Sequence, residues 1–388
     1  MSFGAGRPPF GLSTARRRNV VWLLGLFGLA GIASYHLTRL RDDARAADAL
    51  AAARRSDPAS LPSQPRVTVL VAAWNEGDQI DRHIRSVRAL SYPDLEYILI
   101  AGGPDGTYER AERMLGGRGI LLRQEPGEGK QRALRRGWAQ ATGQIVYLTD
   151  ADCELTDDAL ARLIEPIVAG GGAATGRCQP FPDEVARHPE LLFQWAPEYV
   201  AQARLGSLSP GLQGGNCAVS RVALERAGGF AAEVRTGTDY HLARALAGQQ
   251  IPIAFVHGSV ISTEMPTSVD AYVRRQSRWL RNHWIHGRTT GDRPALLHAV
   301  RTWTIGLVVL TLPLLAPLIG AAALWAWLAL VLHGSLARAR YVAFLARAER
   351  IEVPPTTWLR SPLWFLVDAL SWSRSLLDTL WPGRRGAW

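Results

Sequence analysis

The sequence predicts an α/β domain built on a mainly parallel β-sheet, with membrane helices before and after it. Three apolar runs of strand length, rich in β-branched residues, lie at Val67–Ala73, Glu96–Ala101 and Gln144–Thr149. Helical stretches separate them, notably Gln79–Leu90 and Lys130–Ala141. Strands that alternate with helices form parallel sheets covered on both faces, and ligands bind at the carboxyl ends of such strands. We therefore expect the functional residues directly after each strand.

The composition agrees with a folded domain that meets a polyanionic partner. Of 388 residues, 47% are hydrophobic and 20% are charged, which disfavours wholesale disorder. The formal charge of +10 fits anionic lipid, nucleic acid or a phosphate-bearing substrate. The three cysteines, Cys153, Cys178 and Cys217, show no CxxC spacing, which argues against a zinc site or a disulfide framework.

Lys130 is the single lysine among 44 basic residues. A coding bias that replaces lysine by arginine explains the others, and Lys130 survives either by chance or because its compact ammonium does what a guanidinium cannot. It opens the helix that leads into the strand Gln144–Thr149. A lysine there, together with the positive end of the helix, is suited to a diphosphate.

The first apolar run, Val20–Leu37, has 18 residues and follows three arginines at 16–18. Its length is close to that needed to cross a bilayer. No small-residue cleavage site follows, which favours a membrane anchor over residues 1–40 rather than a removed signal peptide. Arginines flank the run about equally, so its orientation is left open. Residues 41–65 end in prolines and predict a linker that contains at most a short helix.

The second apolar run, Trp303–Gly334, has 32 residues and no charge. Pro313, Pro317 and Gly320 fall near its middle, so two tilted helices joined by a tight break are favoured over one long kinked or re-entrant helix. Arginines lie before and after the run. This pattern predicts a hairpin at 303–334 with both ends in the cytoplasm.

Residues 358–381 form a third stretch, in which Arg360, Asp368 and Arg374 stand among many Trp and Leu residues. This amphipathic pattern favours an interfacial helix over a membrane span. The predicted plan is that of a multi-pass membrane protein. It consists of an anchor at 1–40, a linker at 41–65, an α/β domain at 66–285 and a membrane region at 286–388.

Polar residues follow the first and third predicted strands. Asn75 and Glu76 offer acceptors to a ribose or a base, although a helix N-terminus explains them equally well. Asp150 and Asp152 lie two residues apart at the end of a buried strand, where two carboxylates repel each other and favour a cation. Mg²⁺ and Mn²⁺ prefer one or two carboxylates plus substrate phosphates. A turn followed by helix capping is the alternative.

In the order of its motifs the chain resembles glycosyltransferase family 2, whose members have the GT-A fold. The resemblance covers about residues 66–285. The matching segments are Val67–Glu76, Pro104–Thr107, Gly129–Asp152, Gly214–Asn216, Gly228–Phe230, Thr238–Asp239, Thr263–Pro266 and Arg275–Trp279. The last segment is similar to the (Q/R)xxRW signature of membrane-bound members such as ceramide glucosyltransferases and the cellulose and hyaluronan synthases.

The resemblance implies a catalytic role for several residues. Asp239 matches the general base of the family. Asp152 matches the metal ligand, and Asp150 matches the residue that holds the nucleotide and the metal shell. Arg278 and Trp279 match residues that hold the diphosphate and border the acceptor site. The implied cofactor is Mg²⁺ or Mn²⁺.

Nucleotide binding is expected to involve Asn75, Glu76, Asp105 and Lys130. Here the chain departs from the family, which often has two aspartates at the end of the second strand. This sequence reads Ile100-Ala101-Gly102-Gly103 at that place. Asp105 is the nearest carboxylate, so its contact with the nucleotide is the weakest of these assignments.

The sequence thus predicts a membrane-anchored, inverting glycosyltransferase. We expect it to move a hexose or N-acetylhexosamine from a nucleotide-sugar to a lipid or lipid-linked acceptor, with the catalytic domain on the cytoplasmic side of a bacterial inner or plasma membrane. No nucleic acid is expected as a partner. The alternatives are a processive polysaccharide synthase of the same family and a membrane-tethered basic protein that binds lipid or nucleic acid. The second alternative gives Asp150, Asp152 and Asp239 no role.

Overall fold

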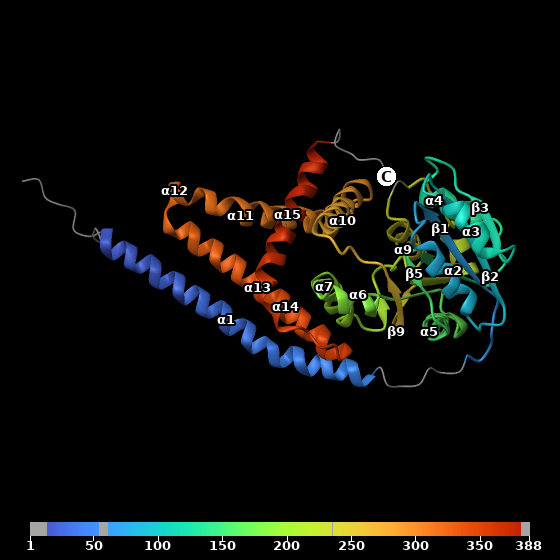
Figure 1. Cartoon of the computed structure of the whole chain (residues 1–388), viewed down its shortest axis with the longest axis horizontal. Coiled ribbons are helices and arrows are strands. Elements are labelled where there is room, and N and C mark those ends of the chain that lie inside the picture. The colour runs from blue at the N-terminus through green and yellow to red at the C-terminus, as the bar shows by residue number, and fades with distance from the viewer. Residues whose placement is uncertain (1–13, 54–60, 235, 382–388) are drawn as a thin grey trace, which may run out of the picture. The chain divides into compact units, whose positions relative to one another are not determined.

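The computed structural model describes residues 14–53, 61–234 and 236–381 (Figure 1). The chain divides into two compact units. The sheet unit lies within residues 49–265, and the helical unit combines the described residues up to 48 with those from 266 onwards.

The sheet unit contains a nine-stranded mixed sheet. Its strands are β1 (Val67–Trp74), β2 (Leu95–Gly102), β3 (Ile120–Arg123), β4 (Ile145–Asp150), β5 (Cys153–Glu154), β6 (Ala173–Pro180), β7 (Leu208–Ser209), β8 (Cys217–Ser220) and β9 (Ile253–Thr263). Their order is β3-β2-β1-β4-β8-β6-β9-β5, with β7 paired to β9. The first four strands in this order are parallel, whereas β8 runs antiparallel to both β4 and β6.

The predicted α/β fold is confirmed. β1, β2 and β4 are the three strands expected from the sequence, and helices separate them along the chain. The parallel half of the sheet is the part that the alternating pattern predicts. The other half is mixed, because β8, β5 and β7 run antiparallel to their partners whereas β6 and β9 are parallel.

Helices cover both faces of the sheet because successive side chains on each strand point to opposite faces. The helices are α2 (Ile80–Ala89), α3 (Thr107–Leu115), α4 (Gly129–Trp138), α5 (Asp157–Val168), α6 (Pro182–Arg187), α7 (Leu191–Ala203), α8 (Arg221–Arg226) and α9 (Thr238–Gly248). Val69 packs in one core with Leu163 of α5, and Leu70 packs in the other with Leu134 of α4 and Leu246 of α9.

The helical unit is formed by long helices. They are α1 (Thr14–Ala53), α10 (Val269–Thr289), α11 (Arg293–Thr311), the 3-10 turn η1 (Leu312–Leu315), α12 (Ala316–Ile319), α13 (Ala321–Glu349), α14 (Pro355–Leu359) and α15 (Ser361–Leu380). Among the described residues, three helical segments are long and apolar enough to cross a membrane: Asn19–Ala52, Arg293–Ile319 and Ala321–Glu349.

Two features of the membrane segments differ in extent from the expectation. α1 does not end near Leu37 but continues to Ala53, so residues 41–53 of the expected linker are helical. The reason is local, since this stretch is rich in alanine and contains no glycine or proline. The apolar run at 303–334 does break at Gly320, whose φ of 78° suits glycine. The helices on either side of this break extend beyond the apolar run: the first begins at Arg293, and the second ends at Glu349.

α1 packs along α13 with both helices running in the same direction. The contacts between them advance together along both helices: Trp22 with Trp325, His36 with His333, Asp43 with Arg340 and Asp48 with Arg347. The ring centroids of the two tryptophans are 5.1 Å apart, and Arg340 Nε donates to Asp43 Oδ2 at 2.8 Å. The contacts change from apolar to ionic towards the carboxyl ends of the two helices.

Candidate active site

Asp150 is the last residue of β4, the strand that lies between β1 and β8. Its carboxylate forms an ion pair with the ammonium of Lys130, which stands in the first turn of α4. The two side chains are 39% and 42% exposed, so the pair is open to solvent. Asp152 follows in the turn that leads to β5, and its carbonyl accepts a hydrogen bond from the backbone N–H of Glu264 at 3.3 Å.

Asp239 reaches the same place from the first turn of α9. Two glycines separate it from Asp150: a Cβ on Gly214 would lie 3.1 Å from Asp239 Oδ2, and a Cβ on Gly215 would lie 3.7 Å from Asp150 Oδ2. Any side chain at these glycines would therefore fill the space beside the carboxylates. The absence of side chains at these glycines lets the loop approach both carboxylates closely.

Lys130 interacts electrostatically with all three aspartates. Burial lowers the pKa of the ammonium, but Asp150, Asp239 and Asp152 together raise it above its ordinary value. Lys130 is thus held fully charged at neutral pH. The structure brings these four residues together from three segments of the sequence.

Glu76 adds a further carboxylate from the end of β1. Burial raises its pKa to about 8, and the negative charges of Asp152, Asp150, Glu264 and Asp105 add to this effect. The preceding residue, Asn75, has a φ of 60°, which turns the chain sharply at the strand end. Carboxylates therefore outnumber the single ammonium at this edge of the sheet, which favours a cation.

Asp105 binds the protein's own backbone. Its carboxylate accepts hydrogen bonds from Gly77 N at 2.8 Å and from Thr107 N at 3.1 Å and Oγ1 at 2.6 Å. Burial opposes ionisation, but these bonds hold the pKa of Asp105 below its usual value. Gly103 has a φ of 123°, and a Cβ there would overlap the side-chain oxygen of Asn75. These contacts explain why glycine stands where the family often has an aspartate.

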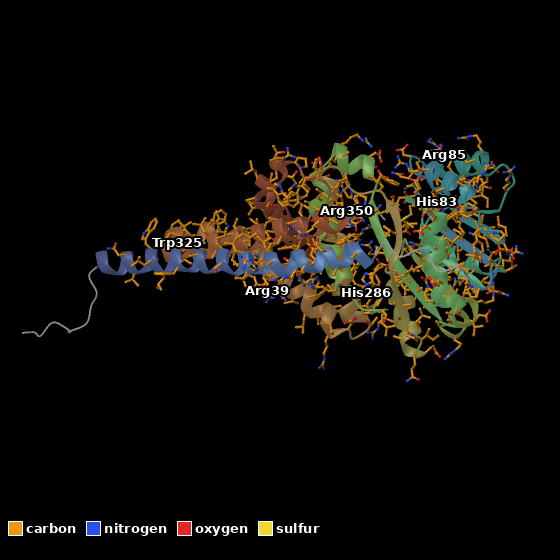
Figure 2. The ribbon with its side chains drawn as sticks, turned by 90° about the horizontal axis from the view of Figure 1, so that it is seen from below. Arg39, His83, Arg85, His286, Trp325 and Arg350 are labelled. Carbon is orange, nitrogen blue, oxygen red and sulfur yellow. The ribbon has the colours of Figure 1, made fainter. Side chains whose placement is uncertain are left out.

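Sequence reasoning missed His83, which binds the backbone of the loop that follows Asp150 and Asp152. His83 lies on α2 and is 1% exposed (Figure 2). Its Nδ1 donates to the carbonyl oxygen of Cys153, the residue after Asp152, at 2.7 Å. Ser86, one turn later on α2, accepts from the backbone N–H of Leu155 at 3.0 Å. A single histidine and a serine in a helix give no signal of this role in the sequence.

The three cysteines are buried free thiols. A Cβ on Gly215 would lie 3.0 Å from Cys153 Sγ and 3.2 Å from Cys178 Sγ, so two of these thiols back the glycine loop. Burial, among other causes, raises the pKa of the Cys217 thiol, which keeps it protonated. The three thiols are thus part of the buried packing next to the glycine loop.

Arg278 and Trp279 lie on α10, in the helical unit. The Trp279 ring is 38% exposed, and the guanidinium carbon of Arg275 lies 4.5 Å from its centroid.

The comparison with protein families identifies the sheet unit. Residues 68–228 match the model of glycosyl transferase family 2. The chain contains a glycosyltransferase family 2 domain. This match includes Glu76, Lys130, Asp150 and Asp152, and it ends before Asp239.

Similar proteins are glycosyltransferases matched over part of their length. The family 2 domain is 32% identical over 114 residues to a poly-beta-1,6-N-acetyl-D-glucosamine synthase of Staphylococcus epidermidis, covering 28% of either chain. It is 25% identical over 114 residues to a dolichol-phosphate mannosyltransferase of Pyrococcus furiosus, covering 29% of this chain and 32% of that one. The chain thus spans about a third or less of the curated relatives it matches.

A solved structure shares the fold over nearly the whole chain. It is the mannosyltransferase PcManGT of Pyrobaculum calidifontis in complex with GDP-Man and Mn²⁺, with a TM-score of 0.51 and 20% identity, covering 91% of this chain and 99% of that one. The GT-A fold expected for the family 2 domain is confirmed.

Proposed function

We propose that the chain is a membrane-anchored, inverting glycosyltransferase that uses a nucleotide-sugar and adds one sugar to a lipid or lipid-linked acceptor. The observation that carries this proposal is the cluster of Lys130, Asp150, Asp152 and Asp239 around Gly214 and Gly215, at the carboxyl ends of the strands of a family 2 domain. An ammonium and carboxylates converge there beside two glycines that approach them closely.

In the proposed reaction an acceptor hydroxyl oxygen forms a bond to the anomeric carbon from the face opposite the nucleotide. The bond from that carbon to the diphosphate oxygen breaks, its electron pair leaves with the diphosphate, and the configuration is inverted. Asp239 takes the hydroxyl proton, as a positioned carboxylate does in general base catalysis. Lys130, held charged by its neighbours, stabilises the negative charge that develops on the leaving diphosphate.

Asp150 and Asp152 would hold a divalent cation, which supplies further neutralisation of the diphosphate when bound. The donor set fits this use, since burial first and the nearby charges of Asp152 and Asp150 next raise the pKa of Glu76 to about 8. Within the part of the chain that the structure describes, no group of three or more His, Cys, Asp or Glu side chains forms a complete metal site. This is expected if the nucleotide diphosphate provides the remaining ligands. The similar PcManGT was solved with Mn²⁺ and GDP-Man.

The parallel packing of α1 and α13 supports an orientation for the amino-terminal anchor, which charge alone left open. If Arg293 and Glu349 both lie on the cytoplasmic side, the break at Gly320 lies on the outer side. α13 then runs from the outer side back to the cytoplasm. α1 runs in the same direction, so its amino terminus lies outside and Asp48 lies inside, where it pairs with Arg347 at 2.7 Å. The family 2 domain that follows α1 is then cytoplasmic, where nucleotide-sugars occur.

A processive polysaccharide synthase is the second candidate, favoured by the 32% identity to the staphylococcal synthase. The helical unit argues against it. The hydroxyls of Thr304 and Thr311 donate to carbonyls of their own helix, and His333 is paired with His36. A channel for a hydrophilic chain needs polar walls, which these helices do not offer.

The purified full chain in lipid vesicles tests the proposal. It would be offered a panel of radiolabelled nucleotide-sugars with Mn²⁺, with Mg²⁺ or with EDTA, and lipids would be extracted. We expect label in the organic phase for one donor, loss of transfer in EDTA, and recovery with metal. Full activity in EDTA, or no transfer from any nucleotide-sugar, would contradict the proposal.

A further inference from the structure

One side of α4 contacts the chain segment 229–233, which precedes α9 in the sequence. Trp138, Arg135 and Arg132 follow one another at intervals of three residues, so they form a row along α4. A Cβ on Gly229 would lie 3.3 Å from Nε1 of Trp138. Nη1 of Arg135 donates to the carbonyl oxygen of Ala231 at 3.4 Å. The segment therefore runs along α4 from its carboxyl end towards its amino end.

Glu233 makes the next contact in this series. Its Oε2 accepts a hydrogen bond from Nε of Arg132 at 3.0 Å, and its Oε1 accepts one from Nη1 of Arg135 at 3.2 Å. The bond from Arg132 is the main cause that holds the pKa of Glu233 below its usual range, so the carboxylate is charged at neutral pH. The three side chains are 42–59% exposed. Exposed ion pairs contribute little to global stability, and the effect of this contact is therefore local.

The chain after Glu233 leads to the helix that carries Asp239. Before the contact, Phe230 is 1% exposed and packs in a core with side chains of α9. The N-cap of α9 is Gly237, which has a φ of 72° and no side chain to cap the helix. The first turn of α9 thus depends on the chain before it for its position. Asp239 in this turn interacts electrostatically with Lys130, which lies two residues before Arg132 on α4.

We propose that Glu233 is a positioning residue for Asp239. By binding Arg132 and Arg135, it holds the chain before α9 against the helix that carries Lys130. This inference rests on the proposed function, in which Asp239 takes the proton of the acceptor hydroxyl. Orientation of a reacting group has a large effect on rate, since a displacement of about 1 Å can cost roughly 10²-fold. Loss of the contact should therefore lower turnover more than it lowers stability or nucleotide binding.

Glu233→Gln in the full chain in lipid vesicles tests this, because glutamine keeps the size of the side chain but not its charge. Glu225→Gln is the matched control, since Glu225 is 56% exposed and pairs with Arg221 of its own helix, α8. Each variant is assayed for kcat and for the KM of the nucleotide-sugar, at about 0.05 M and about 1 M NaCl, because salt screens exposed charges. Hydrogen exchange measured by mass spectrometry follows the first turn of α9, where the N–H of His241 donates to the carbonyl oxygen of Gly237.

We expect Glu233→Gln to lower kcat about tenfold at low salt and to leave KM within about twofold of the wild type. The difference in kcat should narrow at high salt, which weakens the contact in the wild type. Hydrogen exchange in the first turn of α9 should become faster. Glu225→Gln should change none of these quantities. Equal kcat for the two variants, or a parallel change of kcat and KM in Glu233→Gln, would overturn the positioning role.

Asp239→Asn separates the failure of this inference from the failure of the proposed function. Full turnover by Asp239→Asn, or no transfer by the wild type, would contradict the proposed function. Loss of turnover in Asp239→Asn together with full turnover in Glu233→Gln would overturn the inference alone. Hydrogen exchange needs no activity, so unchanged exchange in the first turn of α9 in Glu233→Gln overturns the inference in either case.

Discussion

Asp239 is the residue whose loss should separate binding from turnover. Asp239→Asn keeps the size of the side chain but removes the base, so turnover should fall by roughly 10²–10⁴-fold while nucleotide affinity changes little. Asp158→Asn is a suitable control, because Asp158 is an exposed aspartate in the first turn of another helix, paired with Arg162. The measurement is initial transfer rate together with nucleotide binding by calorimetry. Turnover within a few-fold of the wild type would remove Asp239 from the mechanism.

Lys130 presents the question of whether charge alone is enough. Its ammonium is paired with Asp150 beside the glycine loop, and a guanidinium is larger and planar, with a fork of donors. Lys130→Arg should therefore weaken nucleotide binding by about tenfold, or ~1.4 kcal/mol, although the net charge is kept. Arg132→Lys makes the opposite exchange on the same helix, at a residue paired with Glu233, and should leave binding unchanged. Equal affinity for both variants would mean that Lys130 owes its identity to chance.

His83 gives the folded protein a measurable dependence on pH. Burial lowers its pKa to about 4, from 6.5 when exposed. The folded state thus disfavours the protonated ring, so stability is complete above pH 6.5 and is lost as the pH falls towards 4. The loss amounts to on the order of 3 kcal/mol.

His83→Asn keeps a donor near the position of Nδ1 but does not titrate. Its free energy of unfolding should fall less than that of the wild type between pH 7 and pH 4.5, measured by denaturation in detergent. His83→Phe lacks the donor to Cys153 and should bind Mn²⁺ and nucleotide more weakly than His83→Asn. The half-exposed His188, changed to Asn, serves as the control. Identical pH profiles for wild type and His83→Asn would refute the burial argument.

At the scale of the element, the parallel pairing of α1 and α13 is open to a direct test. The double variant Asp48→Cys/Arg347→Cys should cross-link within one chain with a bifunctional thiol reagent that spans the length of an Asp–Arg pair, because the native side chains meet at 2.7 Å. Trp22→Cys/Trp325→Cys should do the same with a short bifunctional reagent, since the rings are 5.1 Å apart. The mismatched pair Asp48→Cys/Trp325→Cys should not react, and efficient cross-linking of that pair would point to an antiparallel arrangement.

At the scale of the whole molecule, the number and chemistry of the membrane helices determine what can be made. The described residues contain three candidate spans; within them the hydroxyls of Thr304 and Thr311 donate to their own helix, and His36 is paired with His333. We therefore expect chromatography of the labelled product to show one organic-soluble species of fixed size. A ladder of sizes, or a water-soluble polymer made by the purified chain alone, would assign it to the processive synthases.

Local sequence determined the elements that depend on short stretches of chain. The β-branched runs became β1, β2 and β4, and Gly320 became the break in the hairpin, because strand formation and φ > 0 depend on residue type within a few positions. Asp150 could be placed at a strand end for the same reason. The helix boundary at Ala53 was missed, because a polar, alanine-rich stretch continues a helix as readily as it forms a linker.

Tertiary structure alone decided how distant residues meet. Lys130, Asp150 and Asp239 come from three separate segments and share one place only because β4, α4 and α9 pack around Gly214 and Gly215. The same holds for the contact of His83 with Cys153, for the direction of α1 against α13, and for the contact of Glu233 with α4. Periodicity and composition describe a single element, whereas these contacts depend on which faces of two elements are buried together. The sequence by itself therefore determined the family 2 domain and its aspartates. The tertiary structure determined their neighbours: Lys130, which pairs with Asp150, and His83, which binds the loop after Asp152.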